Sequence, residues 1–134
     1  ERMGDELEKV GSLSLECWTS GKDVGITEIQ RIAEQEAKML NESLTAFARL
    51  DLNLARDIFE RERKVDKIYE SALRALATFM IEDPRNIGSV LNVIWIARSL
   101  ERVGDHATNI AEYVIYLVQG VDVRHPEVNQ NTFK

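Results

Sequence analysis

Glycine and proline are scarce in this 134-residue sequence, which has seven glycines and two prolines. Neither residue occurs between Gly25 and Pro84. Tight turns depend on the backbone angles that these two residues favour, so their scarcity excludes a β-sandwich or a β-barrel. The chain is long enough for one domain, and we expect that domain to be helical.

Other absences restrict the function. The single cysteine, Cys17, has no partner for an internal disulfide, which favours a reducing compartment and a cytoplasmic location. Lys and Arg number 17 against 23 Asp and Glu, so no basic stripe is available for a nucleic-acid partner. No apolar run is long enough to span a bilayer, and no export signal is recognisable. We therefore expect the protein to reach a membrane only through its partners.

Four segments carry helical periodicity. The first spans about residues 1–18 and starts in mid-pattern on Glu-Arg rather than on Met, which predicts an N-terminally truncated protein. Thr27 opens a capping-box pattern and is expected to start the second helix. Asp51 is expected to cap a third helix. The fourth follows Pro84 and is expected to end at a glycine C-cap, Gly120.

Each helix has an apolar stripe that we expect to be buried. In the first helix the stripe consists of Met3, Leu7, Val10, Ser14 and Cys17. In the second it consists of Ile29, Ala33, Leu40, Leu44 and Phe47. Trp95 and Tyr113 are expected in the core or in an interface. Because long helices joined by tight turns lie antiparallel, the predicted fold class is all-α, an antiparallel three-helix bundle.

A pentapeptide occurs twice. Residues 1–5 read Glu-Arg-Met-Gly-Asp and residues 101–105 read Glu-Arg-Val-Gly-Asp, both within helical patterns, which predicts a duplicated three-helix unit. The expected domains are the last helix of a truncated first unit (1–20), a complete second unit (26–120) and a loosely ordered tail (121–134). The first helix then lacks the bundle that would cover it. We expect the chains to associate through it as a homodimer.

Four carboxylates are placed where two helices should face each other. Glu62 and Asp66 interrupt the apolar stripe of the third helix, and Glu101 and Asp105 border that of the fourth. The members of each pair are four residues apart and so share a helix face. With the turn centred near Pro84, antiparallel packing brings the two pairs opposite each other. Carboxylate oxygens suit hard cations, so the cluster predicts a divalent metal site for Mg²⁺, Mn²⁺, Ca²⁺ or iron.

Two other interpretations of the cluster stay open. Arg61, Arg63, Arg98 and Arg102 could neutralise it as surface ion pairs, which would make the protein a metal-free adaptor. A carboxylate-bridged metalloenzyme of helical-bundle type is the other alternative. His106 adjoins the motif and could be an extra metal ligand, but a lone histidine beside an apolar face is more often a hydrogen-bonded neighbour. The sequence has no glycine-rich phosphate loop, no His-Glu-x-x-His and no Glu-x-x-His, so we expect no enzyme.

The segment Glu101–His106, Glu-Arg-Val-Gly-Asp-His, is followed by Asn-Ile-Ala-Glu at residues 109–112. These residues resemble the signature of the PhoU family of phosphate-transport accessory regulators. The resemblance extends to residues 79–86 (Phe-Met-Ile-Glu-Asp-Pro-Arg-Asn) and to residues 116–125, and it is closest to the proteobacterial branch.

The resemblance implies two three-helix bundles, each with paired Glu/Asp-x-x-x-Asp motifs that are associated with metal binding. Carried over by position, the metal ligands here are Glu62, Asp66, Glu101 and Asp105. Glu1 and Asp5 match the first bundle's third helix. The resemblance also implies a negative regulator of the phosphate-starvation response that is not an enzyme. Its implied partners are the ATPase of a phosphate ABC transporter and a sensor histidine kinase.

Overall fold

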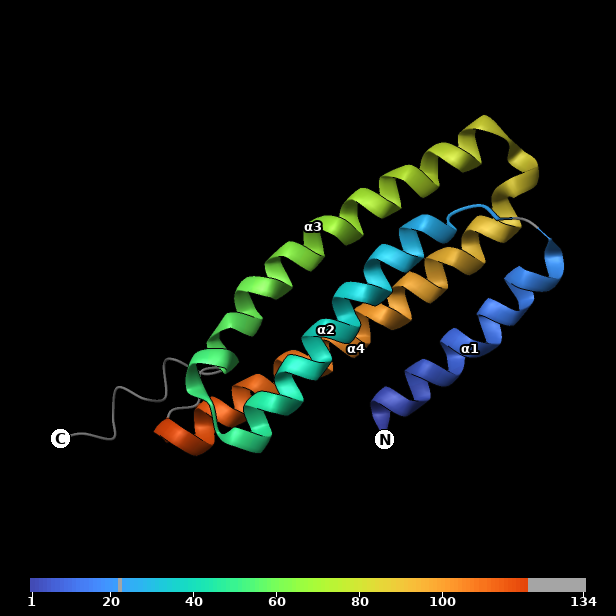
Figure 1. Cartoon of the computed structure of the whole chain (residues 1–134). Helices are drawn as coiled ribbons and strands as arrows, with labels where there is room; N and C mark the ends of the chain where they lie inside the picture. The colour runs from blue at the N-terminus through green and yellow to red at the C-terminus, as the bar shows by residue number, and fades with distance from the viewer. Residues whose placement is uncertain (22, 121–134) are drawn as a thin grey trace.

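The computed structural model describes residues 1–21 and 23–120, which form four α-helices and no strand. The elements are α1 (Arg2–Ser20), α2 (Ile26–Arg49), α3 (Leu52–Glu82), a 3-10 turn η1 (Pro84–Asn86) and α4 (Ile87–Gln119). Helices α2, α3 and α4 form a bundle, and α1 lies along α4 (Figure 1). The predicted all-α fold class is confirmed. The tail predicted over residues 121–134 lies outside the described residues.

The junction between α2 and α3 is made without glycine or proline. Leu50 adopts a left-handed conformation with φ 51°, which ends α2. The Asp51 side chain then accepts a hydrogen bond from the Leu54 amide at 3.0 Å, so the predicted cap of α3 is confirmed. Gly120 ends α4 with φ 66°, also as predicted.

The start of α2 differs from the prediction. The helix begins at Ile26 after Gly25, which has φ 82°, and Thr27 is inside the helix rather than at its cap. A Cβ atom at Gly25 would lie 2.5 Å from Leu76 Cδ2 on α3. Glycine is therefore required both by the backbone angle and by the close approach of α3.

The buried face of α2 agrees with the predicted stripe only in part, since Ile29, Ala33 and Leu40 are partly buried and pack against the core. The structure buries Ile32, Glu36, Met39, Ser43 and Ala46. Leu44 and Phe47, which the apolar stripe placed inside, are 48% and 46% exposed. The true and predicted faces are offset by one residue, which is about 100° around the helix. The prediction was wrong for Leu44 and Phe47, because two of the truly buried positions, Glu36 and Ser43, are polar and so were not recognised from the apolar pattern.

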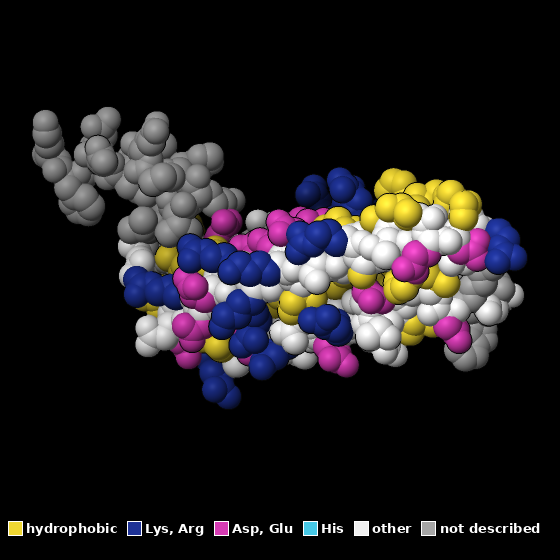
Figure 2. All heavy atoms as spheres, turned by 90° about the horizontal axis from the view of Figure 1, so that it is seen from above, with side chains coloured by type: hydrophobic (Ala, Val, Ile, Leu, Met, Phe, Trp, Pro, Cys, Tyr) yellow, Lys and Arg dark blue, Asp and Glu magenta, His cyan; other side chains and the backbone are white. Residues whose placement is uncertain are grey.

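The outer surface carries several large apolar side chains. On α1, Val10, Leu13 and Cys17 pack against the core, whereas Leu7 is exposed, contrary to the predicted stripe. Trp95 and Tyr113 are each more than half exposed, so neither is a core residue, and their place in an interface stays a prediction. Figure 2 shows interspersed Lys/Arg and Asp/Glu side chains on one face and hydrophobic side chains gathered toward one end. None of the described helices combines the length and the hydropathy that crossing a membrane requires.

Candidate functional site

The four predicted carboxylates lie together where α3 faces α4. Glu62 and Asp66 from α3 and Glu101 and Asp105 from α4 line one small cavity. Its volume is about 10 Å³, close to the minimum that holds a single water molecule. The antiparallel register predicted from the turn at Pro84 thus brings the two motifs to one place.

A fifth carboxylate, which the sequence analysis missed, lies beneath these four. Glu36 projects from the buried face of α2 into the same cavity and is only 3% exposed. Its Oε2 atom has no hydrogen-bond partner among the described residues. Burial raises the pKa of Glu36 to about 8, and the charges of Asp105, Asp66, Glu101 and Glu62 act in the same direction.

Gly104 provides the space that Glu36 occupies. A Cβ atom at position 104 would lie 2.8 Å from both Cδ and Oε1 of Glu36, and closer still to Oε2. Any other residue there would displace the carboxylate. Gly104 stands between Glu101 and Asp105 on α4, so the Glu36 carboxylate meets α4 between the two motif acids. A glycine in mid-helix costs roughly 0.5–1 kcal/mol relative to alanine, and here it has a steric reason.

The outer carboxylates are themselves perturbed. Burial raises the pKa of Glu62, and a hydrogen bond that its Oε1 accepts from Thr108 Oγ1 at 3.1 Å opposes the shift. Burial likewise raises the pKa of Glu101, followed by the charge of Asp105. The cluster therefore resists carrying all of its negative charges at once when no cation is bound.

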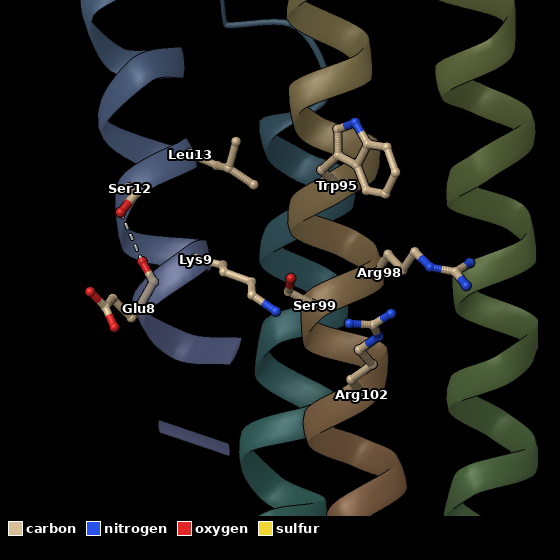
Figure 3. A pocket seen from close by; sticks show the side chains of 8 residues that line it. All are labelled: Glu8, Lys9, Ser12, Leu13, Trp95, Arg98, Ser99 and Arg102. Carbon is tan, nitrogen blue, oxygen red and sulfur yellow. Dashed lines mark hydrogen bonds between the residues drawn. The ribbon is translucent and has the colours of Figure 1, made fainter. Parts of the chain in front are cut away.

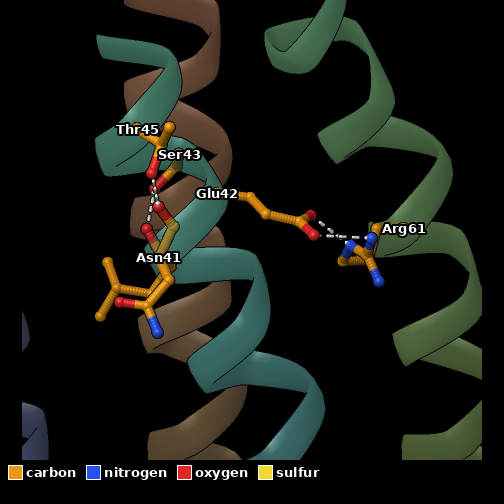
Figure 4. A network of polar contacts seen from close by, with 6 residues as sticks. Asn41, Glu42, Ser43, Thr45 and Arg61 are labelled. Carbon is orange, nitrogen blue, oxygen red and sulfur yellow. Dashed lines mark hydrogen bonds and ion pairs between the residues drawn. The ribbon is translucent and has the colours of Figure 1, made fainter. Parts of the chain in front are cut away.

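The neighbouring arginines do not pair with the cluster. Arg61 Nη2 donates to Glu42 Oε1 at 2.8 Å, across from α3 to α2 (Figure 4). Arg63 pairs with Glu60 at 2.9 Å and Arg102 with Glu6 at 3.1 Å. Among the described residues, no ion pair reaches any of the four predicted carboxylates. The arginines therefore form no ion pair with the cluster, although the charges of Arg98 and Arg102 lower the pKa of Glu101 and so oppose the effect of its burial.

His106 lies on another side of α4. It lines cavities near the start of α1 and not the carboxylate cavity, which agrees with the expectation that this histidine is a neighbour of the motif and not a ligand. Within residues 1–21 and 23–120, no three acidic, histidine or cysteine side chains are already arranged to hold an ion.

A second hollow separates α1 from α4 and has the opposite character. It has a volume of about 440 Å³, and its lining includes Lys9, Trp95, Arg98 and Arg102. Lys9 and Arg102 converge near Ser99, while Arg98 points away from α1 (Figure 3). Both converging cations bind the buried Glu6, the Lys9 bond at 3.0 Å, and hold its pKa at about 2. Lys9 and Glu6 both belong to α1, so it is the bond from Arg102 that attaches α1 to α4, and we assign this region a structural role.

Comparison with known proteins gives one consistent result. A profile of the PhoU domain matches residues 29–114. The PhoU homolog of Pseudomonas aeruginosa, named as a phosphate-specific transport system accessory protein, is 52% identical over 126 residues, which are 93% of this chain and 52% of that protein. The Escherichia coli K12 protein of the same description is 39% identical over 125 residues, 93% of this chain and 52% of that protein.

The fold agrees with these sequence matches. The crystal structure of PhoU from Pseudomonas aeruginosa superposes with a TM-score of 0.86 at 50% identity, covering 90% of this chain and 58% of that one. The chain spans about half the length of the curated relatives it matches.

Proposed function

The chain belongs to the PhoU family, and on that basis we propose that it is an accessory protein of phosphate transport that represses the phosphate-starvation response. The observation that carries the proposal is the similarity, over 93% of the chain, to proteins named as phosphate-specific transport accessory proteins. In this role the protein is an adaptor in the cytoplasm that contacts the transporter ATPase and a sensor histidine kinase. It acts through these contacts and not through catalysis.

We further propose that the bundle binds a divalent metal through Glu62, Asp66, Glu101 and Asp105. Two features of the cavity support this. An all-oxygen donor set suits Mg²⁺, Mn²⁺, Ca²⁺ or iron. The buried Oε2 of Glu36 has no partner in the described residues, so a cation at the cavity would compensate it. When bound, the metal would supply positive charge that neutralises the acidic face between α3 and α4.

The regulatory proposal can be tested in a bacterium that lacks its own PhoU protein and carries a phosphate-starvation reporter. Expression of this protein should restore repression at high phosphate, and the purified protein should retain the transporter ATPase and the kinase in pull-down assays. If the folded, expressed protein leaves the reporter active and retains neither partner, the adaptor proposal is wrong.

The metal proposal has a separate test. Protein stripped with a chelator and reloaded with Mn²⁺ should contain bound metal by elemental analysis and should melt at a higher temperature than the stripped form. The double variant Glu101→Ala, Asp105→Ala should lose both effects. Equal metal content in this variant and in the wild type would refute the site, and the absence of any metal effect on the wild type would favour the metal-free adaptor.

A further inference from the structure

We infer that Glu36 is the inner ligand of this cation site and that Gly104 is the residue that admits its carboxylate to the cavity. The inference rests on the proposed metal binding and deepens it, since Glu36 belongs to neither of the two Glu/Asp-x-x-x-Asp motifs. It changes the site from a two-helix surface cluster to a three-helix site with one buried ligand.

Glu36 occupies a core position of α2. On α2 it lies between Ile32 and Met39, both fully buried in the core, at a place where an apolar side chain would be expected. The side chain is 3% exposed and its Oε2 has no partner in the described part of the chain. A buried carboxyl group with an unsatisfied oxygen destabilises a fold unless something else binds that oxygen.

The Glu36 carboxylate lies against α4 at Gly104. All three atoms of its head group would clash with a Cβ at position 104, so the group lies directly against the α4 backbone. That contact is between the two motif residues of α4, Glu101 and Asp105. Glu36 therefore enters the cavity from the interior, while the four motif carboxylates border it from the outer side, where Asp66 and Asp105 are exposed to solvent.

The set of ligands that includes Glu36 also suits a divalent cation. With Glu36 the site has carboxylates from α2, α3 and α4, so one cation would join all three helices of the bundle. Hard divalent ions accept six or more oxygen ligands and commonly keep water at the solvent side. An inner ligand that is held by packing orients the ion, whereas the exposed motif residues alone would be free to take other rotamers.

The test is a calorimetric Mn²⁺ titration of the chelator-stripped full chain, of the double variant Glu101→Ala, Asp105→Ala, and of three further variants. Glu36→Gln removes the proposed ligand, and Gly104→Ala displaces it while leaving all five carboxylates in the chain. Glu34→Gln is the matched control, because it removes the same charge from an exposed position of the same helix. Circular dichroism establishes that each variant is folded.

We expect Glu36→Gln and Gly104→Ala each to weaken Mn²⁺ binding by about tenfold or more, and Glu34→Gln to leave it within about twofold of wild type. Alanine favours the helix more than glycine does, so weaker binding by Gly104→Ala would not reflect a damaged α4. Wild-type affinity in both variants, with binding lost only in Glu101→Ala, Asp105→Ala, would overturn the inner ligand and leave the proposed site standing. No Mn²⁺ binding by the wild type would overturn the proposed site and the inner ligand with it.

Discussion

Replacement of Glu36 by glutamine should stabilise the metal-free protein near neutral pH, by an amount that grows as the pH rises. The physical reason is the raised pKa of this side chain, about 8 in the fold against 4.5 when unfolded. Between these two values the folded protein keeps a proton that the unfolded chain releases. Because the unfolded state then binds fewer protons, the free energy of unfolding falls as the pH rises.

The size of the effect follows from the shift. Each pH unit between the two pKa values lowers the free energy of unfolding by about 1.4 kcal/mol. From about pH 5 to pH 7.5 the loss for this one group is roughly 3 kcal/mol. Glutamine keeps the shape of the side chain without the titration, and its amide N–H groups can donate to the neighbouring carboxylates. Glu62 and Glu101, whose pKa values are also raised, give a residual slope of the same sign.

The assay is urea unfolding of the chelator-stripped protein, followed by circular dichroism at several pH values over this range. Wild type and Glu34→Gln should lose stability in parallel as the pH rises, and Glu36→Gln should lose much less. If all three proteins show the same pH dependence, Glu36 is not the buried, raised-pKa group that the structure describes.

Three further outcomes are expected. Asp51→Ala should lower the free energy of unfolding by about 1 kcal/mol in urea titrations, because the Leu54 amide loses its acceptor. Arg102→Gln should speed amide hydrogen exchange in α1, because it removes a bond that holds Glu6 against α4. The control Arg63→Gln breaks only an exposed ion pair and should leave hydrogen exchange in α1 unchanged. Leu7→Glu should shift the protein toward monomer in sedimentation velocity, and a wild type that is monomeric at every concentration would contradict association through α1.

Most helix boundaries could be predicted from local signals in the sequence. Asp51 and Gly120 act where they do because a cap needs only a few neighbouring residues. The start of α2 was predicted at the wrong residue. Two conditions require glycine at position 25, namely its positive φ and the close approach of Leu76. The second condition comes from a residue on α3 that no local pattern connects to this turn.

The candidate site was predictable to the extent that it depends on helix periodicity. The four-residue spacing places Glu62 and Asp66 on one helix face and Glu101 and Asp105 on another, and the antiparallel turn brings the two pairs together. Glu36 was missed because it is a single acid in an acidic stretch of α2, and its burial depends on how that helix rotates against α4. One signal was available: Gly104 in mid-helix, far from any turn, indicates that another group needs the space.

The repeated pentapeptide does not have the same surroundings in its two copies. At Gly104 the Glu36 carboxylate lies against the helix, whereas a Cβ at Gly4 would meet nothing within 4 Å. Of the described elements, α1 makes close backbone contact only with α4, so Glu1 and Asp5 have no opposing helix comparable to α3. A titration of this chain with Mn²⁺ should therefore show only binding that Glu101→Ala, Asp105→Ala removes. Tight binding that survives this double change and is lost in Glu1→Ala, Asp5→Ala would show that α1 forms a site of its own, and the argument from surroundings would be wrong.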